Sequence, residues 1–498
     1  MGSVASFDVR RGAVPRWLAA VRRLGLARPS RLAAVSYGVT QSVLLLWWLA
    51  FYPGVMSYDT VTYVWQVSTG NWSSNHSVLY NALVWLSLQV SGELAPLTLT
   101  QTVAAATGLA YAVTGLRRLG PPARWLLVAA TLVVCLPAVG TFIAYVSKDV
   151  AFVITEIWLL GTVSRILTVR RDPAAGPVRP LLLAFCAELT LLGLFRQNGF
   201  LVIAVTAALA TVALPGLRRR LTLAGLGALT AGFAANLVLF PALGVRTPGS
   251  ELLLGTAYGD LAVAYHERPG IFTATDRAVL AEVAPLAFWS RSANCYSSDT
   301  TVNGQREFSL AAAREHRAEL AAVWVRLLKR APDELVQTRL CRGAIAWNPF
   351  PGPAHGWTVK PPVTGAASYF DFPREAIEAS PYAGAIRSAP PVPGLHRAGV
   401  WARRLSDTRS FEWFAWRGAT WCYVAYVAAF LWGRRRREPG ALALVAVVAA
   451  TQLTVLINNP NQLVRYMMGP LVLGVLLLPL AFPTGPPRPA QNLGMPPN

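Results

Sequence analysis

The sequence predicts an all-α polytopic membrane protein: a bundle of about ten transmembrane helices, with interfacial helices in the first outer loop and one large outer segment. Hydrophobic residues make up 54% of the 498 residues and charged residues only 14%, against about 25% in a typical soluble domain. Apolar runs long enough to cross a bilayer as helices recur along the chain. Arg-rich loops separate many of these runs, as is typical of cytoplasmic loops in membrane proteins.

The positive charge of the chain follows this expected topology. A net charge of +21 often indicates nucleic-acid binding. However, the segment 245–414 holds 19 basic and 16 acidic residues, whereas the other 26 basic and 8 acidic residues lie mostly in short loops and the N-terminal arm. Because this distribution fits the positive-inside rule, we expect no nucleic-acid partner. We expect a multi-pass protein of the plasma membrane with both termini in the cytoplasm.

The chain divides into five expected parts. They are a basic cytoplasmic arm (1–31), a seven-span module (32–244) with a first outer loop at 53–94, an extracytoplasmic segment (245–412), three C-terminal spans (413–482) and a Pro-rich tail (483–498). The predicted spans are 33–52, 95–116, 123–141, 150–168, 180–195, 200–215, 221–243, 413–432, 440–457 and 467–482.

The apolar stretch 78–92 is left out of these spans because it is short for a transmembrane helix. If it crossed the bilayer, Arg117, Arg118 and Arg124 would lie outside the cytoplasm, against the positive-inside rule. We therefore expect a helix that packs at the outer face without crossing.

The long outer segment has three features of its own. Helical spacing of apolar residues predicts a helix over about 306–330. The Pro- and Gly-rich stretch 347–365 could be a mobile acceptor-binding loop or a rigid irregular cap. Cys295 and Cys341 could form a disulfide if this segment lies outside the cytoplasm.

The first outer loop holds one carboxylate, Asp59, within residues 51–76. Pro53 and Gly54 break any helix that arrives from the membrane, which places Asp59 just outside the bilayer. A single acid among aromatic and amide side chains suits sugar chemistry. The alternative is a solvated interfacial loop whose carboxylate has no function.

Four more charged residues lie at the expected outer ends of spans, on the same side as Asp59: Lys148, Asp149, Arg196 and Arg465. Ionisable groups near spans are costly. An arginine can bind a lipid phosphate through a bidentate fork and a lysine as a point charge. Anchoring to lipid headgroups is the alternative role for each cation.

Short motifs in this order resemble the GT-C superfamily of membrane glycosyltransferases that use polyprenyl-phosphate sugars. They are PGVMSYD at 53–59, Asn75-His76, Ser147-Lys148-Asp149, FRQNG at 195–199 and Arg465-Tyr466. The closest resemblance is to uncharacterised actinobacterial membrane proteins with a PGxxSxD loop. It covers about 30–240 and 458–470, and it implies a GT-C-like module of seven spans with acids in the first two outer loops.

The chain also departs from the GT-C pattern. Asp59 is single where several members carry a pair of acids, and Asp149 follows a lysine. These differences argue against metal coordination, so we name no metal ligand and no definite cofactor. A divalent cation is the open alternative. The outer segment and the last three spans match no domain of the superfamily.

The resemblance implies transfer of a sugar from a polyprenyl-phosphate donor to an extracytoplasmic acceptor, which could be a cell-envelope glycan, a lipid or a protein. Asp59 is the candidate base in an inverting displacement, Asp149 would orient Lys148 or the acceptor, and Lys148, Arg196 and Arg465 would bind the phosphate. The candidate sugar contacts are Tyr58, Gln66, His76, Gln197, Asn198 and Tyr466. A transporter or lipid flippase is the alternative, with Glu156 and Glu188 on its path.

Overall fold

The computed structural model describes residues 30–247, 254–302, 305–362 and 379–483. Almost all of the expected basic arm and the Pro-rich tail lies outside these residues. Within the described ranges every regular element is a helix, and β-pairing is limited to isolated bridges. The predicted all-α class is therefore confirmed for this part of the chain.

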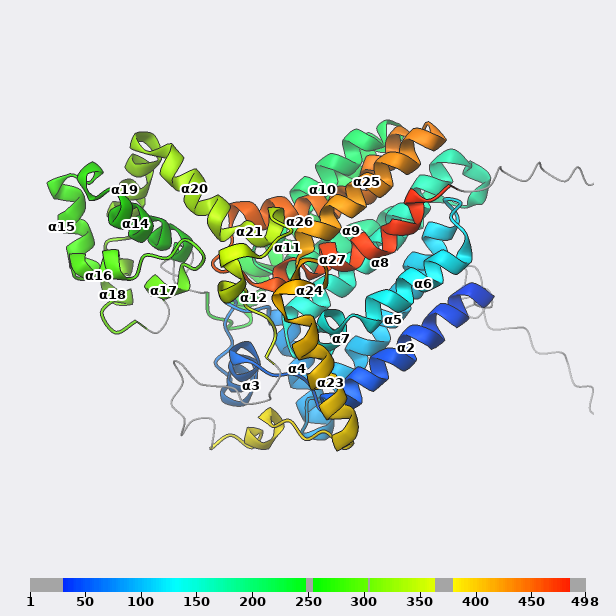
Figure 1. Cartoon of the computed structure of the whole chain (residues 1–498), viewed down its shortest axis with the longest axis horizontal. Coiled ribbons are helices and arrows are strands. Elements are labelled where there is room, and N and C mark those ends of the chain that lie inside the picture. The colour runs from blue at the N-terminus through cyan, green and yellow to red at the C-terminus, as the bar shows by residue number, and fades with distance from the viewer. Residues whose placement is uncertain (1–29, 248–253, 303–304, 363–378, 484–498) are drawn as a thin grey trace, which may run out of the picture.

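The N-terminal half forms a bundle of long helices (Figure 1). α5 packs between α2 and α8, α8 packs on α9, and α11 covers both α9 and α10. The bundle helices are α2 (Arg31–Ala50), α5 (Ala95–Arg117), α6 (Ala123–Cys135), α8 (Lys148–Arg171), α9 (Val178–Phe195), α10 (Gly199–Ala213) and α11 (Arg218–Ala234).

Three C-terminal helices return to this bundle: α25 (Gly418–Arg436), α26 (Ala446–Ile457) and α27 (Met468–Leu477). Every residue of α27 is buried, and this helix packs against α6, α8 and α25. Gly469 makes the contact with α8 possible, because a Cβ added there would lie 1.5 Å from the Oε2 atom of Glu156. The N- and C-terminal halves therefore share one core.

Five helices in the described residues are long and apolar enough to cross a membrane, and a bent pair gives a sixth. This supports a membrane protein. The bent pair is α6 and α7 (Pro137–Ile143), which meet at 69°. The predicted third span, 123–141, therefore corresponds to two helices that meet at a bend, because Pro137 has no N–H to continue the hydrogen bonding of α6.

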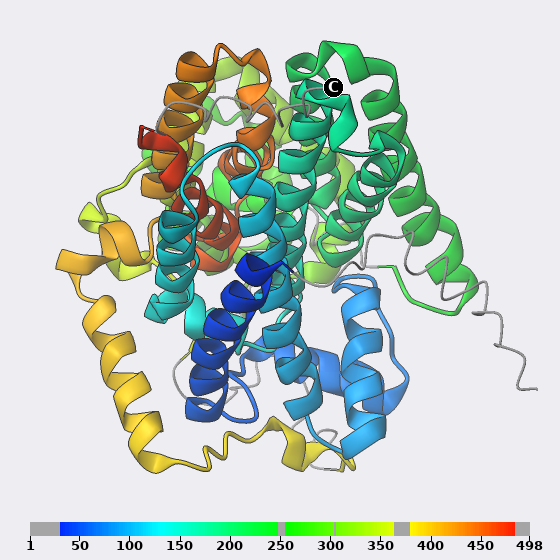
Figure 2. The same ribbon diagram turned by 90° about the vertical axis from the view of Figure 1, so that its right-hand side faces the viewer.

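Two short helices of the predicted first outer loop lie at one end of the bundle, α3 (Tyr58–Thr69) and α4 (Val78–Ser91) (Figures 1 and 2). α4 packs against α3, α5 and α9. It begins where the Ser77 hydroxyl accepts a hydrogen bond from the backbone N–H of Tyr80, and it ends at Gly92, whose φ of 73° favours glycine. The expected helix at 78–92 is therefore present.

Part of the predicted outer segment forms a separate lobe with its own hydrophobic core, at the left of Figure 1. Its helices include α14 (Gly255–Glu267), α15 (Ala274–Val283), α16 (Leu286–Arg291), α18 (Leu310–Glu315), α19 (Arg317–Arg330) and α20 (Pro332–Arg342). The single helix expected over 306–330 is thus two helices. The structure joins Cys295 and Cys341 in a disulfide, with Cα atoms 5.6 Å apart.

The chain then crosses the end of the bundle below the N-terminal helices (Figure 2). α23 (Pro393–Ser406) packs on α2 and α7, and α24 (Arg409–Ala415) leads into α25. Buried Glu412 on α24 accepts hydrogen bonds from Thr358 and Arg417, and residue 359 forms a bridge with residue 463. These contacts fix part of the Pro- and Gly-rich stretch 347–365 against the bundle, and its residues 363–365 lie outside the described residues.

Candidate active site

The structure brings the five predicted charged residues together from distant parts of the chain. Asp59 lies in the first turn of α3, and Lys148 and Asp149 are the first two residues of α8. Arg196 directly follows α9, and Arg465 lies in a 3-10 turn just before α27. We call these five residues the charge cluster.

Local hydrogen bonds place Asp59 beside the start of α8. The Thr60 hydroxyl accepts a hydrogen bond from the backbone N–H of Ser57, 3.0 Å away, and donates one to the carbonyl of Val146 at 3.0 Å. The hydroxyls of Ser57 and Tyr145 are 2.5 Å apart. The first turn of α3 is thereby fixed to the residues that immediately precede Lys148 and Asp149.

Arg465 joins the two carboxylates of the charge cluster. It forms an ion pair with Asp59, and its Nε atom lies 3.2 Å from Oδ2 of Asp149. The other oxygen of Asp149 lies 3.2 Å from Nε of Arg196. Asp149 is only 1% exposed, and its two contacts are ion pairs without the alignment of good hydrogen bonds. Asp149 therefore holds two arginines at a fixed separation.

His76 lies beside the lysine of the cluster. Nδ1 of His76 is 3.1 Å from Nζ of Lys148, and the imidazole meets the ring of Tyr63 edge-on. Burial, reinforced by the nearby charge of Lys148, lowers the pKa of His76 to about 3. A neutral imidazole can accept a hydrogen bond from the ammonium group, so His76 is suited to orient Lys148.

With His76 neutral, the charge cluster holds three cations and two carboxylates and is net positive. Such a site attracts an anion, and arginine side chains can bind phosphate oxygens in pairs. Arg196 also lies over the Tyr466 ring, 4.2 Å from its centroid, which limits its freedom to turn away.

Asp59 is ionised at neutral pH. Burial opposes its ionisation, but the charges of Arg465 and Lys148 outweigh burial and hold the pKa of Asp59 well below its usual range. Its side chain keeps 17% exposure. While Arg465 is bound to it, Asp59 is a weaker base than an ordinary aspartate.

Two predicted sugar contacts form hydrogen bonds within the protein. Gln66 is 2% exposed, and its Oε1 atom accepts hydrogen bonds from the backbone N–H of Ser73 and from Asn81. The Gln197 side chain donates to the carbonyl of Ser74. Both amides therefore fix the loop between α3 and α4, and their assignment to a sugar stays a prediction.

The remaining predicted contacts lie around the charge cluster. Tyr466 lies beneath Arg196, His76 contacts Lys148, and Asn198 immediately precedes α10. Tyr58 is 40% exposed at the start of α3. Tyr145, whose hydroxyl contacts that of Ser57, was not among the predicted site residues. Its position two residues before the Ser-Lys-Asp motif is the signal that could have identified it.

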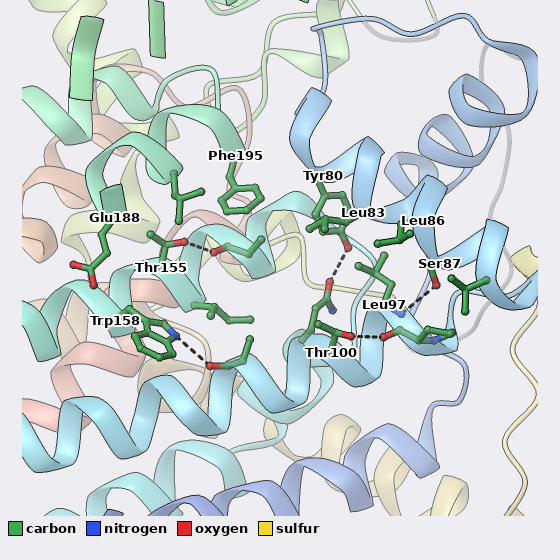
Figure 3. A pocket seen from close by; sticks show the side chains of 17 residues that line it. Tyr80, Leu83, Leu86, Ser87, Leu97, Thr100, Thr155, Trp158, Glu188 and Phe195 are labelled. Carbon is green, nitrogen blue, oxygen red and sulfur yellow. Dashed lines mark hydrogen bonds between the residues drawn. The ribbon is translucent and has the colours of Figure 1, made fainter. Parts of the chain in front are cut away.

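An apolar groove of about 510 Å³ lies between α4, α5, α8 and α9 (Figure 3). Leu83, Leu97, Trp158 and Phe195 line it, and Glu188 lies at the same end as Trp158 in the view. Leu83, Leu86 and Val90 on α4 are exposed at its rim. Side chains from four helices thus form one largely hydrophobic surface.

The groove adjoins the charge cluster through the chain itself. Its lining residue Phe195 is followed directly by Arg196, and its lining residue Ala151 is two residues beyond Asp149. Tyr80, another lining residue, packs edge-on against Tyr63 at 5.2 Å between ring centroids. A ligand with an apolar tail and an anionic head could therefore contact both.

A metal site is not favoured by the arrangement of the acids. No group of three or more His, Cys, Asp or Glu side chains in the described ranges could hold a metal ion. Asp59 and Asp149 both face Arg465, which occupies the position between them that a bridging cation would need.

No model of a known protein family matches the chain, and neither the curated proteins nor the solved structures contain a match. The function must therefore be inferred from the site.

Proposed function

We propose that the protein is a membrane glycosyltransferase that moves a sugar from a polyprenyl-phosphate donor to an acceptor outside the cytoplasm. The observation that carries this proposal is the position of the net positive charge cluster beside the apolar groove. A lipid phosphate has the same two parts, an anionic head and a long hydrocarbon tail. The resemblance to GT-C glycosyltransferases supports the transferred group being a sugar.

The donor would be held at two places. Its phosphate would bind Lys148, Arg196 and Arg465, where the guanidinium groups can form charge-assisted hydrogen bonds. Its first isoprenoid units would lie in the groove, whose volume of about 510 Å³ falls in the range of small-molecule sites, about 300–1,000 Å³. The rest of the tail would extend into the bilayer past the exposed residues of α4.

The reaction would be a single displacement. A hydroxyl oxygen of the acceptor forms a bond to the anomeric carbon, while the bond from that carbon to the phosphate oxygen breaks and the phosphate leaves with the electron pair. The cations stabilise the leaving phosphate, and the hydroxyl proton passes to Asp59. One displacement inverts the configuration at the anomeric carbon.

Donor binding would also activate the base. Arg465 is bound to Asp59 in the structure and keeps the pKa of Asp59 low. A phosphate that draws Arg465 toward itself removes part of this effect, so the pKa of Asp59 rises toward its usual value. The carboxylate then accepts a proton more readily, and only when a donor is bound.

We also propose ten spans, cytoplasmic termini and an outer lobe, with α4 packed at the outer face. Arg117 and Arg170 lie at the ends of α5 and α8 that are opposite the charge cluster, as the positive-inside rule requires. Reporter fusions at Gly92 and Gly120 test this topology. We expect an outer signal at Gly92 and a cytoplasmic signal at Gly120; the reverse result would show that 78–92 crosses the bilayer.

A transporter or flippase is the second candidate, and two buried acids favour it. Glu156 and Glu188 lie within α8 and α9 and accept hydrogen bonds from Thr451 at 2.6 Å and Thr162 at 2.7 Å. Ionisable groups inside spans often mark a transport path. A transport function predicts that Glu188→Gln abolishes lipid movement across proteoliposomes, whereas the transferase needs no such movement.

The decisive experiment compares Asp59→Asn and Arg465→Ala in purified protein. Sugar transfer is measured with a panel of radiolabelled polyprenyl-phosphate sugars, and donor binding is measured on the same samples. Asp59→Asn should slow transfer by about 10²–10⁴ with little loss of donor binding. Arg465→Ala should weaken donor binding markedly.

Glu93→Gln is the matched control, because Glu93 is an exposed carboxylate whose partner is the Tyr52 hydroxyl at 2.8 Å. It should leave transfer unchanged. Near-normal transfer by Asp59→Asn would show that another acid is the catalytic base. Absence of transfer by the wild-type protein from every donor in the panel would contradict the proposed function.

A further inference from the structure

The outer lobe contains a second cavity, of about 540 Å³, that the proposed reaction does not use. Most of its wall comes from α16 and the loop that follows it, and one side chain comes from the segment after α21 (Ala344–Trp347). Its polar and aromatic lining consists mainly of Arg291, Asn294, Tyr296, Gln305, Glu307 and Trp357.

Two aromatic rings form one side of this cavity. Tyr296 and Trp357 lie nearly parallel, with an interplanar angle of 15° and ring centroids 6.3 Å apart. Trp357 is 44% exposed, so it is not part of the core of the lobe. Aromatic rings at the edge of a polar cavity offer flat apolar faces, on which the C–H face of a sugar ring can pack.

The polar groups of the cavity suit a neutral ligand. Arg291 donates to both oxygens of Glu307, at 2.6 and 2.8 Å, so the charged side chains described in the lining balance one another. Both side chains are more than half exposed, which makes their pairing weak and exchangeable. A guanidinium, a carboxylate and two amides can match hydroxyl groups that both donate and accept hydrogen bonds.

The cavity is connected to the charge cluster by one short run of chain. The backbone N–H of Ser298 donates to the carbonyl of Pro460 at 2.7 Å, and Ser297 forms a bridge with Asn461. Arg465 follows five residues after Pro460. Five residues span at most about 18 Å, which lies within the reach of an oligosaccharide of a few units.

We infer that this cavity binds the acceptor, and that the acceptor is a neutral oligosaccharide chain. Sugar units distant from the reacting hydroxyl would pack on Tyr296 and Trp357, while the end of the chain reaches Asp59. This inference rests on the proposed function for the role of acceptor. Carbohydrate binding by the lobe can be tested without it.

The test is isothermal titration of the full-length protein in nanodiscs, with no lipid donor present. The probes are three neutral trisaccharides: maltotriose, mannotriose and arabinotriose. At least one should bind the wild-type protein, and Trp357→Ala and Tyr296→Ala should each weaken its binding by about tenfold or more. Trp401→Ala is the control, because Trp401 on α23 is 67% exposed and does not line the cavity.

Gln305→Ala removes a polar group of the cavity without removing a ring, and it should also weaken binding. It therefore tests the cavity even where the aromatic variants misfold. Lack of binding by all three probes, or unchanged binding in correctly folded Trp357→Ala and Gln305→Ala, would overturn the inference. Failure of the proposed function looks different: trisaccharide binding still depends on Trp357, but no sugar is transferred. If transfer occurs and Trp357→Ala leaves the KM for the acceptor unchanged, the inference alone is wrong.

Discussion

Asp149 offers a test in which stability and ligand binding should change in opposite directions. Its oxygens lie 3.2 Å from Nε of Arg196 and 3.2 Å from Nε of Arg465, and its side chain is 1% exposed. Asp149→Asn keeps the shape of the side chain but removes the negative charge that holds the two arginines at a fixed separation. Removing one partner of a buried ion pair costs about 3–5 kcal/mol, so the unliganded variant should be much less stable.

The same change should strengthen the binding of an anion. The charge cluster gains one net positive charge, and an extra charge about 6 Å from a phosphate contributes about 2–3 kcal/mol at an effective dielectric constant of about 20. Screening at the 20% exposed Arg465 reduces this value, and we expect roughly tenfold tighter binding of a polyprenyl monophosphate. Sugar transfer should nevertheless slow, because Arg196 and Arg465 lose their fixed separation.

The assay measures thermal unfolding, binding of the polyprenyl monophosphate and sugar transfer in nanodiscs. Asp172→Asn is the control, since Asp172 is an exposed carboxylate directly after the other end of α8. It should change none of the three. Weaker binding of the monophosphate by a folded Asp149→Asn protein would refute the assignment of this cluster to a phosphate.

Two further predictions concern the surroundings of the charge cluster. The pKa of His76 is lowered to about 3 from about 6.5, so below pH 6.5 the unfolded chain binds a proton that the folded protein does not. Stability should therefore fall by about 1–2 kcal/mol, after allowance for partial exposure, as the pH drops from 6.5 to 5. The melting temperature of His76→Gln should fall less over this range than that of the wild-type protein. An equal fall would contradict the lowered pKa of His76. Ala104→Phe should fill part of the groove and weaken binding of the polyprenyl monophosphate about tenfold without changing the affinity for inorganic phosphate. Val103→Phe, at a 39% exposed neighbouring position that does not line the groove, should have little effect, and equal loss in both variants would argue against a tail site.

The helices of the bundle could largely be predicted from apolar runs and Arg-rich loops. Nearly every predicted span has a helical counterpart, because in a bilayer the backbone must satisfy its own hydrogen bonds. The bend between α6 and α7 was not predicted, although a proline at position 137 inside an apolar run indicates it. Only five or six helices in the described residues meet the length and hydropathy required of a span, so the count of ten stays a prediction.

The charge cluster could be predicted in composition but not in its contacts. Assigning residues to one side of the membrane grouped Asp59 with Arg465, which is 406 residues away, but no pattern in the sequence shows that they form an ion pair. Sequence likewise could not show that Gln66 bonds to Asn81 rather than to a ligand, because both roles use the same amide. The groove could not be predicted, because its lining depends on how α4, α5, α8 and α9 pack together.

The segment between α26 and α27 has a consequence for how this chain can be divided. It supplies Arg465 to the charge cluster, and its residues 460–463 are paired with Ser298 and with Val359. The first 244 residues alone therefore lack one cation of the charge cluster, and residues 245–459 supply the backbone partners of the segment that carries it. Separate expression of residues 1–244 and 245–498 should restore activity only when both fragments are produced in the same membrane.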